Sequence, residues 1–158
     1  MDIFARSFGS PGYGKRRARQ IDHHLARLAS ERDELIWTFR YWLEYSGDLR
    51  QYLWAHRNQD VERARKVLEI LPPLTVSKIL KYLVGSYWDR YCGWPDLLVY
   101  KEDDFFFAEV KSSSDKLSEA QKRWIKNNYE ELHLPFKLVK IHKSRQASNE
   151  SQRTASSD

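Results

Sequence analysis

Apolar residues recur at helical spacing between residues 16 and 91, with three or four positions from one to the next. The double proline at 72–73 ends the third of these segments, because proline lacks an amide donor and cannot continue a helix. The pattern predicts a helical subdomain over residues 16–91. Its four apolar faces comprise Ile21, Leu25 and Leu28; Leu35, Phe39, Trp42 and Leu43; Val61, Ala64, Leu68 and Leu71; and Val76, Ile79, Leu80, Leu83 and Tyr87.

After Gly93 the pattern changes to short β-prone runs separated by polar residues. Ser118 and Gln121 have the spacing of a capping box, in which two side chains satisfy the first amides of a helix. We therefore expect an α+β protein, with the helical N-terminal subdomain packed on a small αβ core over residues 92–143. The predicted elements of this core are strands at 97–100 and 105–108, a helix at 119–131 and a strand at 136–141.

Both ends of the chain differ from the rest in composition. Residues 7–14 are rich in glycine and proline, which predicts an extended N-terminal segment over residues 1–15. Residues 144–158 are almost entirely polar and cannot bury enough apolar surface to become ordered. They predict a disordered tail.

The chain has 158 residues, of which 14% are aromatic, and this composition suits a folded domain. No apolar run reaches the roughly 20 residues that span a bilayer, and the N-terminus carries no secretory pattern. Cys92 stands alone, which excludes a disulfide framework, and we expect it to be a passive buried thiol. We expect the protein to be located in the nucleus if it is eukaryotic and otherwise in the cytoplasm. We expect neither secretion nor a membrane partner.

Lysine and arginine number 27 against 22 aspartate and glutamate, which gives a net charge of +5 and favours anionic partners such as nucleic acid. Phosphate contacts are one interpretation of the basic residues, and a solvated helix start is the other. Trp94 is equally suited to stacking on a base or to plugging the core. The candidate nucleic-acid-binding residues are Lys15, Arg16, Arg17, Arg19, Trp94 and Lys122.

Further aromatic residues lie at helical spacing in the N-terminal half. They suit stacking on unpaired bases, but their spacing favours packing in the core. These residues are Trp37, Tyr41, Trp42, Tyr45, Tyr52 and Trp54.

The predicted hairpin brings charged residues together at its open end. A turn centred between residues 102 and 103 places Asp96 opposite Glu109, and opposed residues have Cβ atoms roughly 4.5–5.5 Å apart. Lys111 lies two residues beyond Glu109 and therefore on the same face of the strand. The sequence predicts that two carboxylates and an ammonium group converge there.

Such a pair of carboxylates suits Mg²⁺ or Mn²⁺, and the Val110 carbonyl offers a further hard oxygen. A metal ion at this point would bind a phosphate and lower the pKa of a bound water. Lys111 would orient the attacking hydroxide or stabilise the developing charge. The alternative is a surface ion pair between Asp96 and Lys111, because such short motifs also occur by chance.

The runs 93–100, 107–111 and 115–124 resemble the VRR-NUC nuclease domain of the PD-(D/E)XK nucleases. They match its G-x-P-D-L run, its E-V-K run and its D-x-L-S-x-x-Q-x-x-W helix start. The resemblance implies a restriction-endonuclease-like core with metal ligands at Asp96, Glu109 and the Val110 carbonyl. It also implies a catalytic Lys111 and a site role for Gln121, for which the capping box is the structural alternative.

The upstream helices resemble in pattern the C-terminal region of the Fanconi-associated nucleases, which implies a nuclease of 5′ flaps in interstrand crosslink repair. The family usually has a further acid on a helix before the Pro-Asp strand. Here only Asp89 lies on the expected helix, with Glu69 and Glu44 as substitutes.

Our hypothesis is a metal-dependent nuclease acting on branched, flapped or junction DNA, with DNA-repair proteins as further partners. Two alternatives stay open. In the first alternative, the chain is a DNA-binding scaffold with weak or no catalysis. In the second, it is a homodimeric nuclease that resembles a Holliday-junction resolvase. The sequence does not fix its oligomeric state.

Overall fold

The computed structural model describes residues 10–45 and 58–142, without the side chains of residues 42–45 and 58. The predicted tail and the aromatic residues Tyr52 and Trp54 lie outside the described residues. The helices are α1 (Pro11–Arg16), α2 (Ala18–Ser30), α3 (Arg32–Tyr45), α4 (Asn58–Ile70), α5 (Pro73–Gly85), α6 (Tyr87–Arg90) and α7 (Glu119–Asn127), followed by the π-helical turn η2 (Asn128–Leu132). The strands are β1 (Leu97–Lys101), β2 (Asp104–Ser112) and β3 (Phe136–Ile141).

The N-terminal segment is helical where the sequence predicted an extended chain. Pro11 stands in the first turn of α1, where its missing amide donor costs nothing. A Cβ on Gly14 would lie 2.9 Å from the Val84 carbonyl oxygen, so glycine lets α1 approach the end of α5 closely. The prediction for residues 11–15 was wrong because Pro11 starts a helix and Gly14 permits its close packing on α5.

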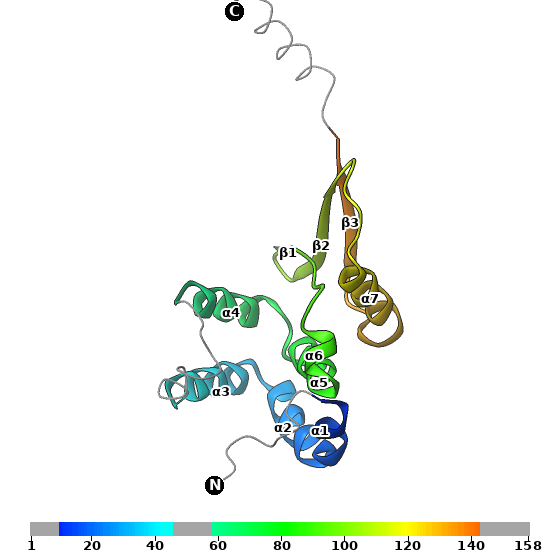
Figure 1. Ribbon diagram of the computed structural model, residues 1–158. Helices are drawn as coiled ribbons and strands as arrows, with labels where there is room; N and C mark the ends of the chain where they lie inside the picture. Colours follow the sequence, from blue (N-terminus) through cyan, green and yellow to red (C-terminus); the bar gives the residue numbers. More distant parts are fainter. Residues whose placement is uncertain (1–9, 46–57, 143–158) are drawn as a thin grey trace, which may run out of the picture.

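The helical subdomain is organised around α5, which packs along α2. The buried Ser77 hydroxyl of α5 donates a hydrogen bond of 3.0 Å to the Leu25 carbonyl of α2. The predicted helix over residues 75–90 is divided at Ser86 into α5 and the short α6. In Figure 1, α5 and α6 lie between the N-terminal helices and the sheet.

The sheet has three strands in the order β1-β2-β3. Strands β1 and β2 are antiparallel, with Leu97 opposite Ala108 and Lys101 opposite Asp104. The turn is thus shorter than predicted, but its centre is the predicted one. Strand β3 pairs in parallel with β2, which requires a crossover connection, and α7 with η2 provides it.

One hydrophobic core joins the helices to the sheet. Trp124 of α7 is 1% exposed and contacts rings on β2 and β3. The same core takes in residues of α3 and α5, so the helical subdomain packs on the αβ core as predicted. Its buried members are Leu35, Leu71, Val76, Tyr82, Phe107, Trp124, Leu132 and Leu134.

Three residues predicted to be buried are exposed instead. Trp37 and Tyr41 of α3 stack on each other at the surface, with ring centroids 5.2 Å apart and exposed fractions of 58% and 40%. They lie one helical turn apart, so mutual stacking satisfies the spacing that suggested a core. The Cys92 thiol is also exposed. Within the described ranges, no helix has both the length and the apolar character needed to span a membrane.

Gly93 fixes the approach of the Pro-Asp turn to α7. Its φ of +84° belongs to the left-handed region, and a Cβ there would lie 2.2 Å from the Ala120 carbonyl oxygen. The two backbones are in contact at this point, so there is no space for a side chain. The position therefore requires glycine.

We expect Gly93→Ala to lower the free energy of unfolding by about 2–5 kcal/mol, from backbone strain and overpacking together. Gly12→Ala is the matched control, because a Cβ at Gly12 meets chiefly the flexible Arg16 side chain, at 3.2 Å. Urea unfolding of both variants measures the difference. Equal stabilities for the two variants would contradict this account of Gly93.

Candidate active site

Asp96 lies where the ladder between β1 and β2 ends. Its Oδ2 accepts a hydrogen bond of 3.2 Å from the Val110 amide, just beyond the pair of Leu97 with Ala108. This bond holds the Asp96 carboxylate against the β2 backbone. Asp96 is therefore level with Glu109, as the predicted register requires.

Glu109 is the buried charge of the site, at 2% exposure. Its Oε1 accepts two short hydrogen bonds, from Lys111 Nζ and from Gln121 Nε2, each at 2.5 Å. Burying a carboxylate is costly unless charged and polar partners compensate it, and these two donors do so. The structure thus brings Asp96, Glu109, Lys111 and Gln121 together at the open end of the hairpin.

The second oxygen of Glu109 differs from the first. Glu109 Oε2 is buried and has no hydrogen-bond partner among residues 10–45 and 58–142. Buried polar atoms in proteins nearly always have one, so an oxygen left without a partner calls for an explanation. A divalent cation would explain this oxygen, since Mg²⁺ and Mn²⁺ prefer hard oxygen ligands. Glu109, Asp96 and the Val110 carbonyl would hold it.

Gln121 takes part in both of the roles that the sequence left open. Its side-chain oxygen Oε1 accepts a hydrogen bond of 2.9 Å from the Ser118 backbone amide, and its side-chain nitrogen Nε2 donates to Glu109. The Ser118 hydroxyl in turn accepts a hydrogen bond of 3.2 Å from the Gln121 backbone amide. The capping box of α7 therefore fixes which end of the Gln121 side chain faces the buried carboxylate.

The electrostatics of the site keep Lys111 charged. The hydrogen bond to Glu109 raises the pKa of Lys111, and the charges of Glu109, Asp96 and Asp115 act in the same direction. Asp115 accepts a hydrogen bond of 3.1 Å from the Ser112 amide, and its bonds to Ser112 lower its pKa. Lys111 is thus a permanent cation at neutral pH, set among three acids.

The structure does not bring the expected upstream acid to the site. Asp89 accepts a hydrogen bond from Ser86 on α6, and Glu69 pairs with Lys66 at 3.2 Å on α4. Glu44 is among the residues whose side chains are not described. Across residues 10–45 and 58–142, no group of three or more histidine, cysteine, aspartate or glutamate side chains is placed to hold a metal. A metal here would need water or substrate oxygens to complete its shell.

The candidate DNA-binding residues are spread over the ends of α1, α2 and α7. Lys15, Arg16, Arg17 and Arg19 are exposed, while Lys122 pairs with Glu119 at 2.7 Å. The resulting ion pair lowers the pKa of Glu119. None of these contacts tests a role with nucleic acid, which stays a prediction.

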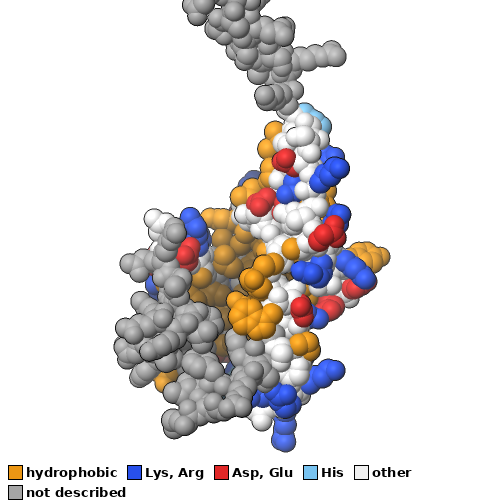
Figure 2. All heavy atoms as spheres, viewed as in Figure 1, with side chains coloured by type: hydrophobic (Ala, Val, Ile, Leu, Met, Phe, Trp, Pro, Cys, Tyr) orange, Lys and Arg blue, Asp and Glu red, His pale blue; other side chains and the backbone are white. Residues whose placement is uncertain are grey.

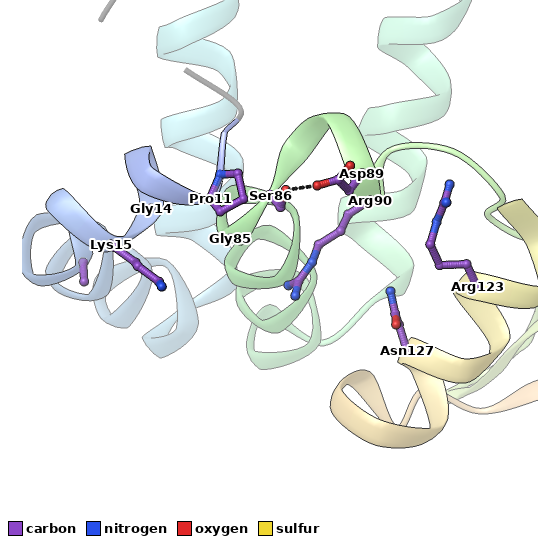
Figure 3. A pocket seen from close by; sticks show the side chains of 10 residues that line it. Pro11, Gly14, Lys15, Gly85, Ser86, Asp89, Arg90, Arg123 and Asn127 are labelled. Atoms are coloured by element: carbon purple, nitrogen blue, oxygen red, sulfur yellow. Dashed lines mark hydrogen bonds between the residues drawn. The ribbon is translucent and has the colours of Figure 1, made fainter. Parts of the chain in front are cut away.

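Lys15 also lines a cavity of about 570 Å³ between α1, α6 and α7 (Figure 3). Arg123, which the sequence reasoning passed over, lines it from α7, with Arg90 and Asp89 from α6. The position of Arg123 beside Lys122 on a predicted helix was the available signal. Glu109 is not among the residues that line this cavity.

Trp94 packs into the core beside the active site. Its ring lies 5.4 Å from that of Trp124 and 6.2 Å from that of Phe107, and its Nε1 donates to the Arg90 carbonyl at 3.0 Å. Phe107 is two residues before Glu109 on the same strand face. These contacts describe a packing role, and base stacking by Trp94 is left untested.

Comparison with known proteins identifies the family. The VRR-NUC domain model matches residues 29–140. This chain belongs to the VRR-NUC domain family. The family assignment confirms the resemblance inferred from the motifs and, at the level of the domain, the prediction of a nuclease. The matched region takes in the helices from α3 onward, not only the hairpin and α7.

Two curated relatives and one solved structure are similar. A Fanconi-associated nuclease 1 homolog from Arabidopsis thaliana is 26% identical over 115 residues, which is 69% of this chain and 13% of that protein. The homolog from Schizosaccharomyces pombe is 35% identical over 66 residues, which is 40% of this chain and 9% of that protein. The structure of paFAN1 bound to 2nt 5'flap DNA with gap covers 88% of this chain and 26% of its own, with a TM-score of 0.61 and 20% identity.

The structural match confirms the predicted α+β fold of the PD-(D/E)XK type. The chain spans only a small part of the length of these relatives. Their activities, substrates and partners are therefore not transferred with the family.

The capping box separates the two roles of Gln121 experimentally. Ser118→Ala keeps the backbone amide that donates to the Gln121 side chain and removes only the hydroxyl that caps α7. It should therefore lower the free energy of unfolding by about 0.5–2 kcal/mol. Gln121→Glu keeps the cap acceptor but replaces the donor to Glu109 by a second carboxylate. Like charges repel, so we expect Gln121→Glu to lose more stability than Ser118→Ala at neutral pH, with recovery as the pH falls and the introduced carboxylate protonates.

Urea unfolding of both variants at neutral and acidic pH is the measurement. A loss for Gln121→Glu that does not change with pH would mean that its side chain does not face Glu109.

Proposed function

We propose that this chain is a divalent-metal-dependent nuclease domain that hydrolyses phosphodiester bonds in branched or 5′-flap DNA. The observation that carries the proposal is the convergence of Asp96 and Lys111 on a buried carboxylate, Glu109, which keeps one oxygen without a partner. The family assignment supports the reaction class. The name of the structural neighbour, which refers to flap DNA, supports the substrate class.

Asp96, Glu109 and the Val110 carbonyl are the residues that would hold Mg²⁺ or Mn²⁺. When bound, the ion would act as a Lewis acid toward the phosphate and lower the pKa of a bound water. The fold does not depend on it, because a hydrophobic core joins the strands, α7 and α5. Chelation of the metal is therefore expected to stop cleavage and leave the protein folded.

Lys111 supplies the positive charge of the reaction. Its ammonium group is held by Glu109, and the hydrogen bond to Glu109 raises its pKa, so it is suited to donate hydrogen bonds. It is suited to stabilise the negative charge that develops on a phosphate during attack. Gln121 holds Glu109 in place, and its own orientation is fixed by Ser118.

Basic residues beside the site are suited to the DNA backbone. Lys15 and Arg123 line the same cavity from two different helices, and Arg16, Arg17 and Arg19 continue the positive charge along α1 and α2. Contacts of this kind make binding salt-dependent. The similarity to the Fanconi-associated nuclease homologs supports a role in DNA repair, including interstrand crosslink repair, together with other repair proteins.

A second candidate function is DNA binding with weak or no catalysis. It is favoured by the lack, among the described side chains, of a group of three or more histidine, cysteine, aspartate or glutamate residues placed to hold a metal. The two functions differ in a single measurable property, which is cleavage by the wild-type chain.

We expect Asp96→Asn and Lys111→Ala to reduce cleavage of a labelled 5′-flap duplex in Mn²⁺ by about 100-fold or more. Asp96→Asn removes a carboxylate that would hold the metal, and Lys111→Ala removes the ammonium group that would stabilise charge on the phosphate. Lys101→Ala is the matched control, because Lys101 ends β1 at the turn, at the opposite end of the hairpin from the site. Gel-based cleavage rates and binding constants on the same duplex are measured for every variant.

Cleavage that survives in both site variants would contradict the assigned site. Binding without cleavage by the wild-type chain would favour the scaffold. A rate for Lys101→Ala as low as that for Lys111→Ala would mean that general charge, and not the site, determines the rate.

A further inference from the structure

The short helix α6 carries three aromatic rings in mutual contact. Tyr87 and Tyr91 are stacked with centroids 5.5 Å apart, and Trp88 meets Tyr91 edge to face at 6.0 Å. These residues are three and four positions apart, so their side chains lie on one side of the helix. Trp88 is 58% exposed and Tyr91 is 49% exposed, which places a broad aromatic surface in contact with solvent.

Hydrogen bonds and a cation–π contact hold α6 in place. Arg90 donates to the Tyr82 carbonyl of α5 at 2.8 Å and to Glu131 of η2 at 3.1 Å, and its guanidinium lies 4.4 Å from the Tyr82 ring centre. The Ser86 hydroxyl binds Asp89 at the start of the helix. These bonds fix α6 between the helical subdomain and the αβ core. The exposed rings therefore stand on a rigid support.

This aromatic surface adjoins the active site through the backbone. One residue, Cys92, separates Tyr91 from Gly93, so at most about 7 Å of chain joins them, and Gly93 abuts the Ala120 carbonyl of α7. The next residue of α7, Gln121, binds Glu109. A strand of DNA leaving the acidic site across the first turn of α7 would thus meet α6.

The charges around α6 suit a nucleic acid. On the other side of the helix Lys15 and Arg123 line the cavity of Figure 3. Figure 2 shows hydrophobic side chains at the surface at the level of α6, with basic and acidic side chains interspersed beside them on the side of α7. A hydrogen bond with Cys92 raises the pKa of Tyr91, so its phenol stays neutral next to phosphates.

We propose that Trp88 and Tyr91 form a stacking platform for an unpaired nucleobase of the DNA substrate. Every base has a π-face, so aromatic rings backed by nearby cations bind single-stranded segments without reading their sequence. The net charge of +5 favours a nucleic acid over an apolar protein partner at this surface. The inference rests on the proposed function, since it requires a DNA substrate with an unpaired nucleotide. It assigns to α6 the recognition of that nucleotide.

The test compares two flap duplexes that differ in one group. One carries ordinary unpaired nucleotides and the other carries abasic residues at the same positions, so only the bases are missing. Binding is measured in chelator, where cleavage does not interfere. We expect the wild-type chain to bind the abasic duplex about 5- to 160-fold more weakly for each base that stacks.

Trp88→Ala should bind the two duplexes with equal affinity, and Trp88→Phe should restore most of the difference. Trp37→Ala is the matched control, because Trp37 has the same exposed fraction of 58% on a different helix and should leave the difference intact. Thermal unfolding establishes that each variant is folded. If Trp88→Ala is unfolded, Tyr91→Ala takes its place.

Equal binding of the two duplexes by the wild-type chain would overturn the platform, as would a base dependence that persists in Trp88→Ala. The same loss of base dependence in Trp37→Ala would also overturn it. These outcomes leave the proposed nuclease function untouched, because it depends on cleavage in Mn²⁺. No binding of either duplex by the wild-type chain would overturn both.

Discussion

The burial of Glu109 is the constraint on which the candidate site depends. A carboxylate at 2% exposure needs compensation, and Lys111 and Gln121 supply it to one oxygen only. The remaining oxygen has no partner within the described part of the chain. This asymmetry fits a site that is completed by a cation, because a carboxylate with a purely structural role would have both oxygens satisfied.

The fold keeps this charge in position through the start of α7. Gly93 lets the Pro-Asp turn lie directly on Ala120, and the next residue, Gln121, reaches from the helix cap to Glu109. The crossover of α7 and η2 then returns the chain to β3, which pairs in parallel with the strand that bears Glu109. Packing of Trp124 and positioning of the carboxylate are therefore parts of one arrangement. A change at Gly93 would act on both.

The hairpin shows what local sequence determines. The register follows from a turn centre and an alternation of faces, both of which can be read from residues 93–111, so the positions of Asp96, Glu109 and Lys111 were predictable. The capping box likewise predicted the first turn of α7. That Gln121 donates to Glu109 as well was not predictable from spacing alone, because it depends on how closely α7 packs on β2.

Features that depend on long-range packing were the ones missed. Gly14 was taken as a sign of an extended chain because its partner, the carbonyl of Val84, is far away in sequence. Trp37 and Tyr41 have the spacing of a core but stack on each other at the surface. Of the rings at α6, the sequence pattern included only Tyr87 in an apolar face, because a four-residue helix gives no periodic pattern of its own. The cavity lined by Lys15 and Arg123 likewise joins residues from opposite ends of the chain.

The most direct measurement is Mn²⁺ binding to the folded chain, followed by electron paramagnetic resonance of the free ion. The account predicts binding by the wild-type protein, weakened at least about tenfold in Glu109→Gln, whose side chain has the same shape but no charge. Circular dichroism would show both proteins folded. Absence of Mn²⁺ binding by the wild-type chain, or equal affinity in Glu109→Gln, would contradict the claim that the orphaned oxygen of Glu109 is a metal ligand.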